Sequence, residues 1–119
     1  MTITLLTLLK RRAGMSKADF IAYYESHHRL IGEKVLRGYA TRYTRRYLHP
    51  TDGVDEHEDA DVVMEIDFPD EATRDACFVA MADETVMAEI VADEERLFDR
   101  KRIRTFALDE RRSKVSSAG

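Results

Sequence analysis

The chain has 119 residues, and 44% of them are hydrophobic, which is enough for one domain with its own core and argues against wholesale disorder. Its formal net charge of −4 argues against a dedicated nucleic-acid surface. A single cysteine, Cys77, excludes an internal disulfide and fits a reducing cytoplasm. No apolar run approaches the ~20 residues that a bilayer-spanning helix needs, and the N-terminus lacks the pattern of a signal peptide. We therefore expect a cytoplasmic protein that binds neither nucleic acid nor membrane.

The first predicted element is a strand over residues 2–9, which are almost purely apolar residues and threonine. A basic turn at residues 10–14 ends it. Ser16 is a good helix N-cap, and Asp19 three residues later resembles a capping box. Apolar and aromatic residues then recur at helical spacing, which predicts a helix over residues 17–36.

Two further strands follow this helix. Residues 38–48 alternate β-branched and aromatic residues with other types, which predicts the second strand. Period two places three tyrosines of this strand on one face: Tyr39, Tyr43 and Tyr47. Residues 51–59 are acidic and read as a solvated loop, and residues 61–68 predict the third strand.

The second half of the chain repeats the helix-then-strand order. Pro69 starts a second helix, because proline is tolerated in the first helical turn. Apolar residues between 86 and 97 predict one or two short helices, and residues 102–108 predict the fourth strand. We expect one domain over residues 1–110 and a flexible tail over residues 111–119, which are charged and then serine-rich.

The element order is strand-helix-strand-strand-helix-strand. This is the split βαβ arrangement, an α+β ferredoxin-like fold with helices on one face of a four-stranded antiparallel sheet. No predicted element covers the other face of the sheet, and with the tyrosine stripe this face is too apolar and aromatic to be exposed to water. A second copy of the chain would cover it most simply, so we predict a homodimer whose two sheets form a barrel-like core.

The two adjacent histidines, His27 and His28, are the first candidates for chemistry. Histidine has an unperturbed pKa of roughly 6.5, within reach of neutral pH. His28 is either a general acid or base or a histidine that hydrogen-bonds a carbonyl at a helix end, and we favour the first reading. His27 lies about 100° further round the helix and cannot share that environment. Helical metal chelation wants ligands at i and i+4, where Gly32 stands instead, so no metal is expected.

Two tyrosines complete the candidate site. Tyr24 precedes His28 by four residues and shares its helix face, where it either hydrogen-bonds a ligand oxygen or satisfies the core. Tyr43 forms either a pocket wall for a planar ligand or, as we favour, part of a packed core or dimer interface. We therefore predict a mostly apolar pocket between the first helix and the sheet, with His28 as the catalytic residue and Tyr24, His27 and Tyr43 as substrate contacts. Cys77 lies among alanines and reads as a packed thiol.

Several features of the chain resemble EthD-domain proteins. In the first thirty residues these are the strand end and glycine turn Leu8-Leu9-Lys10-Arg11-Arg12-Ala13-Gly14-Met15-Ser16, then Phe20, the pair Tyr23-Tyr24, and His28. The acidic and aromatic segment 93–100 resembles the family's approach to its last strand. Two details depart from the family pattern. The usual proline after the histidine is absent, since His28-Arg29-Leu30 stands here, and Tyr24 replaces the usual tryptophan.

The resemblance implies a member of the dimeric α+β barrel superfamily and a hydrophobic, aromatic or polyketide-like ligand. Superfamily relatives run eliminations, cyclisations, isomerisations or cofactor-independent oxygenations, in which His28 would be the general acid or base. This implies a cofactor-free lyase, isomerase or monooxygenase. The alternatives are a non-catalytic small-molecule-binding accessory protein of a degradation pathway and, more remotely, a haem binder. The chain has no glycine-rich dinucleotide loop, P-loop or metal motif, so no cofactor is expected.

Overall fold

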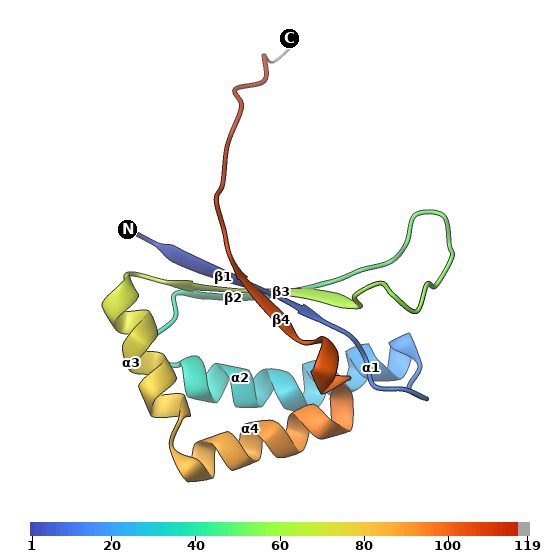
Figure 1. Ribbon diagram of the computed structural model, residues 1–119, viewed down its shortest axis with the longest axis horizontal. Helices are drawn as coiled ribbons and strands as arrows, with labels where there is room; N and C mark the ends of the chain where they lie inside the picture. The colour runs from blue at the N-terminus through green and yellow to red at the C-terminus, as the bar shows by residue number, and fades with distance from the viewer. Residues whose placement is uncertain (117–119) are drawn as a thin grey trace.

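The computed structural model describes residues 1–116 as two layers, a four-stranded antiparallel sheet with helices on one face (Figure 1). The elements in chain order are β1 (Ile3–Leu9), α1 (Lys17–Tyr23), η1 (Tyr24–His28), α2 (Arg29–Leu36), β2 (Arg42–Tyr47), β3 (Val62–Phe68), α3 (Glu71–Met81), α4 (Glu84–Leu97), η2 (Arg100–Arg102) and β4 (Arg104–Ala107). The strands lie in the order β2-β3-β1-β4. The predicted α+β ferredoxin-like fold is confirmed.

β1 lies in the middle of the sheet, antiparallel to β3 on one side and to β4 on the other. β2 pairs with β3, so β2 and β4 are the edge strands. Alternate residues of the strands point into the helix layer, where Leu9, Val62 and Phe68 are buried. Leu9 and Val62 pack with Phe20 and Leu97, whereas Phe68 packs with Leu36 and Cys77, and this apolar interior holds the site between the two layers.

The first helix runs through residues 17–36 as predicted, but its middle turn, η1, is a π-helix. Ser16 caps the helix start by accepting a hydrogen bond from the Asp19 N–H at 3.1 Å. Inside the helix, Ser26 Oγ bonds back to the Ala22 carbonyl at 2.7 Å. The π turn carries both candidate histidines, and such wide turns often occur at functional sites.

The second strand is shorter than predicted, because its first residues end the preceding helix instead. The backbone N–H groups of Tyr39 and Ala40 both bond to the Leu36 carbonyl at 3.0 Å. Gly38 has a φ of 86°, a left-handed conformation that glycine adopts without a Cβ penalty. β2 therefore starts at Arg42 rather than near Gly38.

The second pair of helices begins at aspartate caps. Asp70 accepts a hydrogen bond from the Thr73 N–H at 2.7 Å and starts α3, just after the predicted position at Pro69. Asp83 caps α4, which is one helix of 14 residues. Cys77 on α3 is fully buried, as the packed-thiol reading predicts, and burial raises the pKa of its thiol.

The prediction of an aromatic uncovered sheet face is wrong. Tyr43 and Tyr47 point toward the helices and pack against the core, because they pair with the inward-facing Ile66 and Val62 of β3. The uncovered face carries ion pairs over β2 and β3, where Arg42 bonds both Glu65 and Asp67. It carries an apolar surface over β1, β3 and β4, formed by Leu6, Leu8, Val63 and Phe106.

After β4 the chain leaves the sheet on the side away from the helices (Figure 1). Residues 108–116 have no helix or strand, and residues 117–119 of the predicted tail lie outside the described residues. No helix within residues 1–116 is long and apolar enough to cross a bilayer.

Candidate functional site

A mostly apolar cavity of about 110 Å³ lies between the helices and the sheet. Aliphatic and methionine side chains of α2, β3, α3 and α4 form most of its lining. Its polar side chains are Tyr24, His28, Tyr43 and Glu94. Three of the four predicted site residues therefore meet here, across a helix and a strand that follow one another in the chain.

Gly32 lets the sheet approach the helix closely at this point. A Cβ on Gly32 would lie 2.7 Å from Tyr43 Oη and 2.9 Å from Tyr43 Cζ, which is closer than side chains tolerate. The glycine therefore admits the phenol of Tyr43 against α2. There the Tyr43 hydroxyl lies 3.0 Å from the hydroxyl of Tyr24 and hydrogen-bonds to it. The result is a pair of hydroxyls at the cavity wall.

His28 is held by a buried carboxylate from the other end of the chain. Its Nδ1 lies 2.9 Å from Oδ2 of Asp93 on α4, and Asp93 also accepts a hydrogen bond of 2.5 Å from the Tyr23 hydroxyl. The Asp93 side chain is 6% exposed. An ionised carboxylate only accepts hydrogen bonds, so this contact assigns the ring hydrogen of the neutral imidazole to Nδ1. Nε2 is then the nitrogen that can take a proton.

The other ring nitrogen of His28 remains accessible. Nε2 has no hydrogen-bond partner within the described part of the chain. No side-chain nitrogen or oxygen there is both fully buried and unpaired, so Nε2 is not fully buried. The ring stands edge-on to Tyr24 and to Phe98, each 5.1 Å away between centroids. Packing and the Asp93 contact thus fix the imidazole, which lines the cavity, and leave Nε2 without a partner in the described part of the chain.

The structure does not bring His27 to the cavity, so its predicted substrate contact is not supported. His27 is exposed, and its ring packs against Tyr23 at 4.7 Å between centroids. One step along a helix turns a side chain about 100°, which takes His27 away from the face that carries His28.

Asp93 is the functional candidate that the sequence reasoning missed. It is 65 residues from His28, and their contact depends on how α4 packs against η1. The sequence signal for Asp93 is its place at the start of the acidic and aromatic segment 93–100, which does not indicate its partner.

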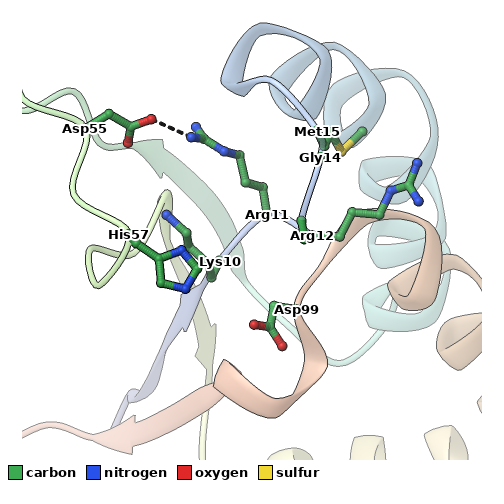
Figure 2. Close-up of a pocket in the computed structure, with 9 residues that line it drawn as sticks. Lys10, Arg11, Arg12, Gly14, Met15, Asp55, His57 and Asp99 are labelled. Carbon is green, nitrogen blue, oxygen red and sulfur yellow. Dashed lines mark hydrogen bonds and ion pairs between the residues drawn. The ribbon is translucent and has the colours of Figure 1, made fainter.

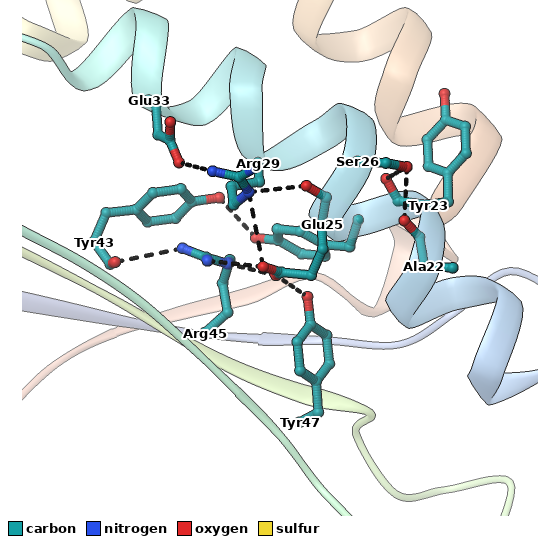
Figure 3. A network of polar contacts seen from close by, with 10 residues as sticks. Ala22, Tyr23, Glu25, Ser26, Arg29, Glu33, Tyr43, Arg45 and Tyr47 are labelled. Atoms are coloured by element: carbon teal, nitrogen blue, oxygen red, sulfur yellow. Dashed lines mark hydrogen bonds and ion pairs between the residues drawn. The ribbon is translucent and has the colours of Figure 1, made fainter.

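A network of charged side chains joins η1 to β2 beside the tyrosines (Figure 3). Glu25 accepts hydrogen bonds of 2.7 and 3.0 Å from Arg45 and one of 2.5 Å from the Tyr47 hydroxyl. The guanidinium of Arg45 lies 4.9 Å from the centre of the Tyr43 ring. Chiefly through its hydrogen bonds with Arg45, the pKa of Glu25 is lowered. The network clamps the strand to the π turn and holds Tyr43 in place.

Burial decides the protonation state of the hydroxyl pair. Desolvation raises the pKa of Tyr24 well above the ordinary value and also raises the pKa of Tyr43. Both phenols therefore stay neutral at physiological pH. A neutral hydroxyl can donate a hydrogen bond, whereas a phenolate only accepts.

A larger hollow of about 350 Å³ lies at the basic turn, where Lys10 and Arg11 are paired with carboxylates (Figure 2). Arg11 bonds Asp55 across it at 2.5 Å. Lys10 and Arg11 also reach the buried Asp61, at 3.5 and 3.4 Å. His57 lines the hollow from the acidic loop, and no cluster of three metal-ligating side chains exists within residues 1–116. We therefore treat this turn as a structural charge centre around Asp61.

Solved structures with similar folds support this architecture. The chain is similar to an EthD family protein from Bacillus halodurans C-125, with a TM-score of 0.65 and 14% identity over 93% of this chain and 100% of that one. It is similar to SnoaB from Streptomyces nogalater, a cofactor-independent oxygenase solved as a mutant, with a TM-score of 0.56 and 12% identity over 94% and 95%. A dimeric ferredoxin-like protein of unknown function from Bacteroides fragilis matches with a TM-score of 0.54 and 7% identity over 90% and 92%.

Identities this low establish the fold alone. A search of curated protein sequences gave no significant match. The family assignment rests on the sequence model of the EthD domain, which matches residues 12–101 and so includes the π turn, the cavity and Asp93. By this match the chain belongs to the EthD domain family.

Proposed function

We propose that this chain is a small enzyme that works without a cofactor on a hydrophobic, aromatic or polyketide-like molecule. In this proposal His28 is the general acid or base for an elimination, isomerisation or related proton transfer. The single observation that carries the proposal is the His28–Asp93 hydrogen bond of 2.9 Å at the edge of an apolar cavity. A positioned group of this kind typically contributes about 100- to 10,000-fold in rate.

Each part of the site has a chemical task in this mechanism. Asp93 keeps the ring hydrogen on Nδ1, so Nε2 accepts a proton from the substrate. The imidazolium that forms is stabilised by the same carboxylate, which stays ionised. Tyr23 donates the second hydrogen bond to Asp93 and fixes its orientation. Asp93 and Tyr23 are therefore positioning residues that act through His28.

The cavity supports a small apolar ligand. Its volume of about 110 Å³ is of the same order as the roughly 150 Å³ cavity that binds benzene in an engineered protein. Met64 and Met81 line it and give an adaptable wall for larger ligands. A porphyrin does not fit a space of this size, so the site does not suit haem.

Ligand binding and turnover test the proposal together. A panel of aromatic and polyketide-like molecules is titrated against the wild type, His28→Gln and His27→Gln, the last being the matched control on the exposed neighbour. We expect His28→Gln to keep binding and to lose turnover by at least about 100-fold, while His27→Gln changes neither. Unchanged turnover in His28→Gln would refute the catalytic role.

The alternative function is a non-catalytic module that holds a hydrophobic molecule for a degradation pathway. The same cavity supports it, because an apolar lining with few polar groups is what binding alone requires. Binding of panel members with no turnover under any condition would favour this reading. The fold similarity to a cofactor-independent oxygenase supports including oxygen consumption among the measured activities.

The single cysteine of the chain is a buried free thiol, and on that ground we propose a cytoplasmic location.

We also infer that two copies of the chain pair through the uncovered face of the sheet. Leu6, Leu8, Val63 and Phe106 form an apolar surface there, and Phe106 is 36% exposed. A dimeric relative in fold supports the pairing.

Light scattering tests this inference directly. Phe106→Asp should turn a dimer into a monomer, because it buries a charge in the proposed interface. Val79→Asp is the matched control, since Val79 is 75% exposed on α3, on the helix side. A monomeric wild type at micromolar concentration, or a Phe106→Asp variant that stays dimeric, would contradict the inference.

A further inference from the structure

The hydroxyl pair at the cavity has one hydrogen too many for its own bonding. Tyr24 and Tyr43 together carry two hydroxyl hydrogens, and the 3.0 Å contact between them uses one. Among residues 1–116 the other hydrogen has no acceptor. Tyr24 is fully buried and Tyr43 is half-buried in the cavity lining, so the free hydrogen is available to Tyr43 at the cavity when Tyr24 donates to it. A hydroxyl hydrogen without a protein acceptor can be donated to an oxygen of a bound ligand.

The surroundings define what this acceptor can be. Burial raises the pKa of both phenols, so both stay protonated at neutral pH. The pair can then donate a hydrogen bond to a ligand, but neither phenol can act as a base toward it. Glu94, the carboxylate in the lining, is paired with Arg100 at 3.3 Å. The rest of the wall near the pair is apolar, with Ile31, Val35 and Ile66. A neutral or partly negative oxygen on an apolar ring fits these groups.

We propose that the cavity takes a single-ring ketone or related carbonyl compound, whose oxygen accepts the free hydrogen of the Tyr24–Tyr43 pair. The proposal rests on the proposed function and names its substrate class. The volume of about 110 Å³ limits the enclosed part of the ligand to about one ring. The carbonyl is favoured over an ether or alcohol oxygen because His28 shares the cavity. A base beside a hydrogen-bond donor is the arrangement that removes a proton from carbon next to a carbonyl.

The reaction involves proton transfer alone. His28 Nε2 takes a proton from the carbon beside the carbonyl, and the electron pair of that C–H bond becomes a carbon–carbon double bond. The carbonyl π pair moves onto oxygen, which becomes an enolate and accepts the tyrosine hydrogen bond. The imidazolium keeps its Nδ1–H on Asp93 and returns the proton to the same carbon or to another one. No oxidant, reductant or second reactant is consumed.

Acetophenone and ethylbenzene form the test pair, because they differ by the oxygen. We expect the wild type to bind acetophenone about 10-fold more tightly than ethylbenzene, measured by NMR titration. The double variant Tyr24→Phe with Tyr43→Phe should bind both equally. The single variants are less informative, since the remaining hydroxyl could still donate. Tyr47→Phe is the matched control, because its hydroxyl serves Glu25 and lies outside the cavity lining.

A second readout separates this inference from the proposed function. In D₂O the methyl hydrogens of acetophenone should exchange in the presence of the wild type and not with His28→Gln, as seen in the decay of the methyl ¹H signal. A ketone preference without exchange supports the hydroxyl pair as the ketone site and refutes proton transfer by His28. Exchange that depends on His28 without a ketone preference overturns the role of the pair. Equal binding in the wild type, a preference that survives in a folded double variant, or no binding of either compound also overturns it.

Discussion

The contact between Gly32 and Tyr43 allows the packing of the site to be tested without a substrate. In Gly32→Ala the new Cβ would lie 2.7 Å from Tyr43 Oη, so the phenol must move by about 0.7 Å to reach ordinary contact. The ring has little room to move. Tyr24 holds its hydroxyl at 3.0 Å, and the Arg45 guanidinium covers one ring face at 4.9 Å. We therefore expect strain rather than a free side-chain rotation.

Three effects set the size of the change. Overpacking of this kind costs about 1–3 kcal/mol, and losing the Tyr24–Tyr43 hydrogen bond costs about 0.5–1.5 kcal/mol. Alanine in place of a helical glycine stabilises the folded state by about 1 kcal/mol, because alanine has the higher helix propensity. The expected result is a loss of about 0.5–3.5 kcal/mol in the free energy of unfolding. At an open helical position the same substitution would stabilise the protein.

A double-mutant cycle tests whether Tyr43 causes the loss of stability, because removing Tyr43 should reverse the sign of the Gly32→Ala effect. In a Tyr43→Val background the obstruction is gone, so Gly32→Ala should stabilise the protein by about 1 kcal/mol in urea unfolding. Ala88→Gly on the exposed side of α4 calibrates the glycine–alanine difference in this protein. Equal effects of Gly32→Ala in both backgrounds would show that Tyr43 does not pack on Gly32, and the described cavity wall would be wrong.

Three further predictions concern the groups around the site. Asp93→Ala should lower the free energy of unfolding by about 1–3 kcal/mol in urea, because it leaves the Tyr23 hydroxyl and His28 Nδ1 without their acceptor; an unchanged value would contradict the buried contact. The pKa of Glu25 is lowered by Arg45, so the ionised carboxylate stabilises the fold above its unfolded-state pKa of about 4.3, and this stabilisation is lost as the pH falls through the lower folded-state value. Glu25→Gln should therefore be less stable than the wild type at pH 7, with the difference shrinking below about pH 4, and a constant difference would argue against the ion pair. Cys77 should resist a thiol reagent in the native protein and react in urea, since it is buried and its thiol pKa is raised; fast native labelling would refute its burial.

Hydrophobic periodicity was sufficient to predict the fold. The apolar run at 2–9 and the helical spacing in 17–36 record which side of each element is buried, and burial of apolar surface is the main driving force of folding. Period two also placed Tyr43 and Tyr47 together on one face of their strand. It does not say which face of the sheet meets the helices, so the tyrosine stripe was wrongly placed on the uncovered face, although the pocket prediction put Tyr43 beside the first helix, where it lies. That choice is made by the register with β3, where Tyr43 pairs with Ile66.

The candidate site was predictable where its residues are local and not where they are distant. Tyr24 and His28 are four residues apart, so helical geometry alone places them together. Asp93 reaches His28 only through the packing of α4 on η1, for which the spacing within one helix holds no signal. The π turn is likewise a local irregularity that regular periodicity does not predict.

The proposed proton transfer requires His28 to carry its hydrogen on Nδ1, toward Asp93, and to keep Nε2 available at the cavity. Long-range ¹H–¹⁵N NMR of ¹⁵N-histidine-labelled protein measures this, because protonated and unprotonated ring nitrogens resonate far apart. His28→Gln assigns the signals among the four histidines. At a pH where the ring is neutral we predict a protonated Nδ1, an unprotonated Nε2, and a shift of the Nε2 signal when acetophenone is added. A neutral ring with its hydrogen on Nε2, or an Nε2 signal that acetophenone leaves unmoved, would contradict the account.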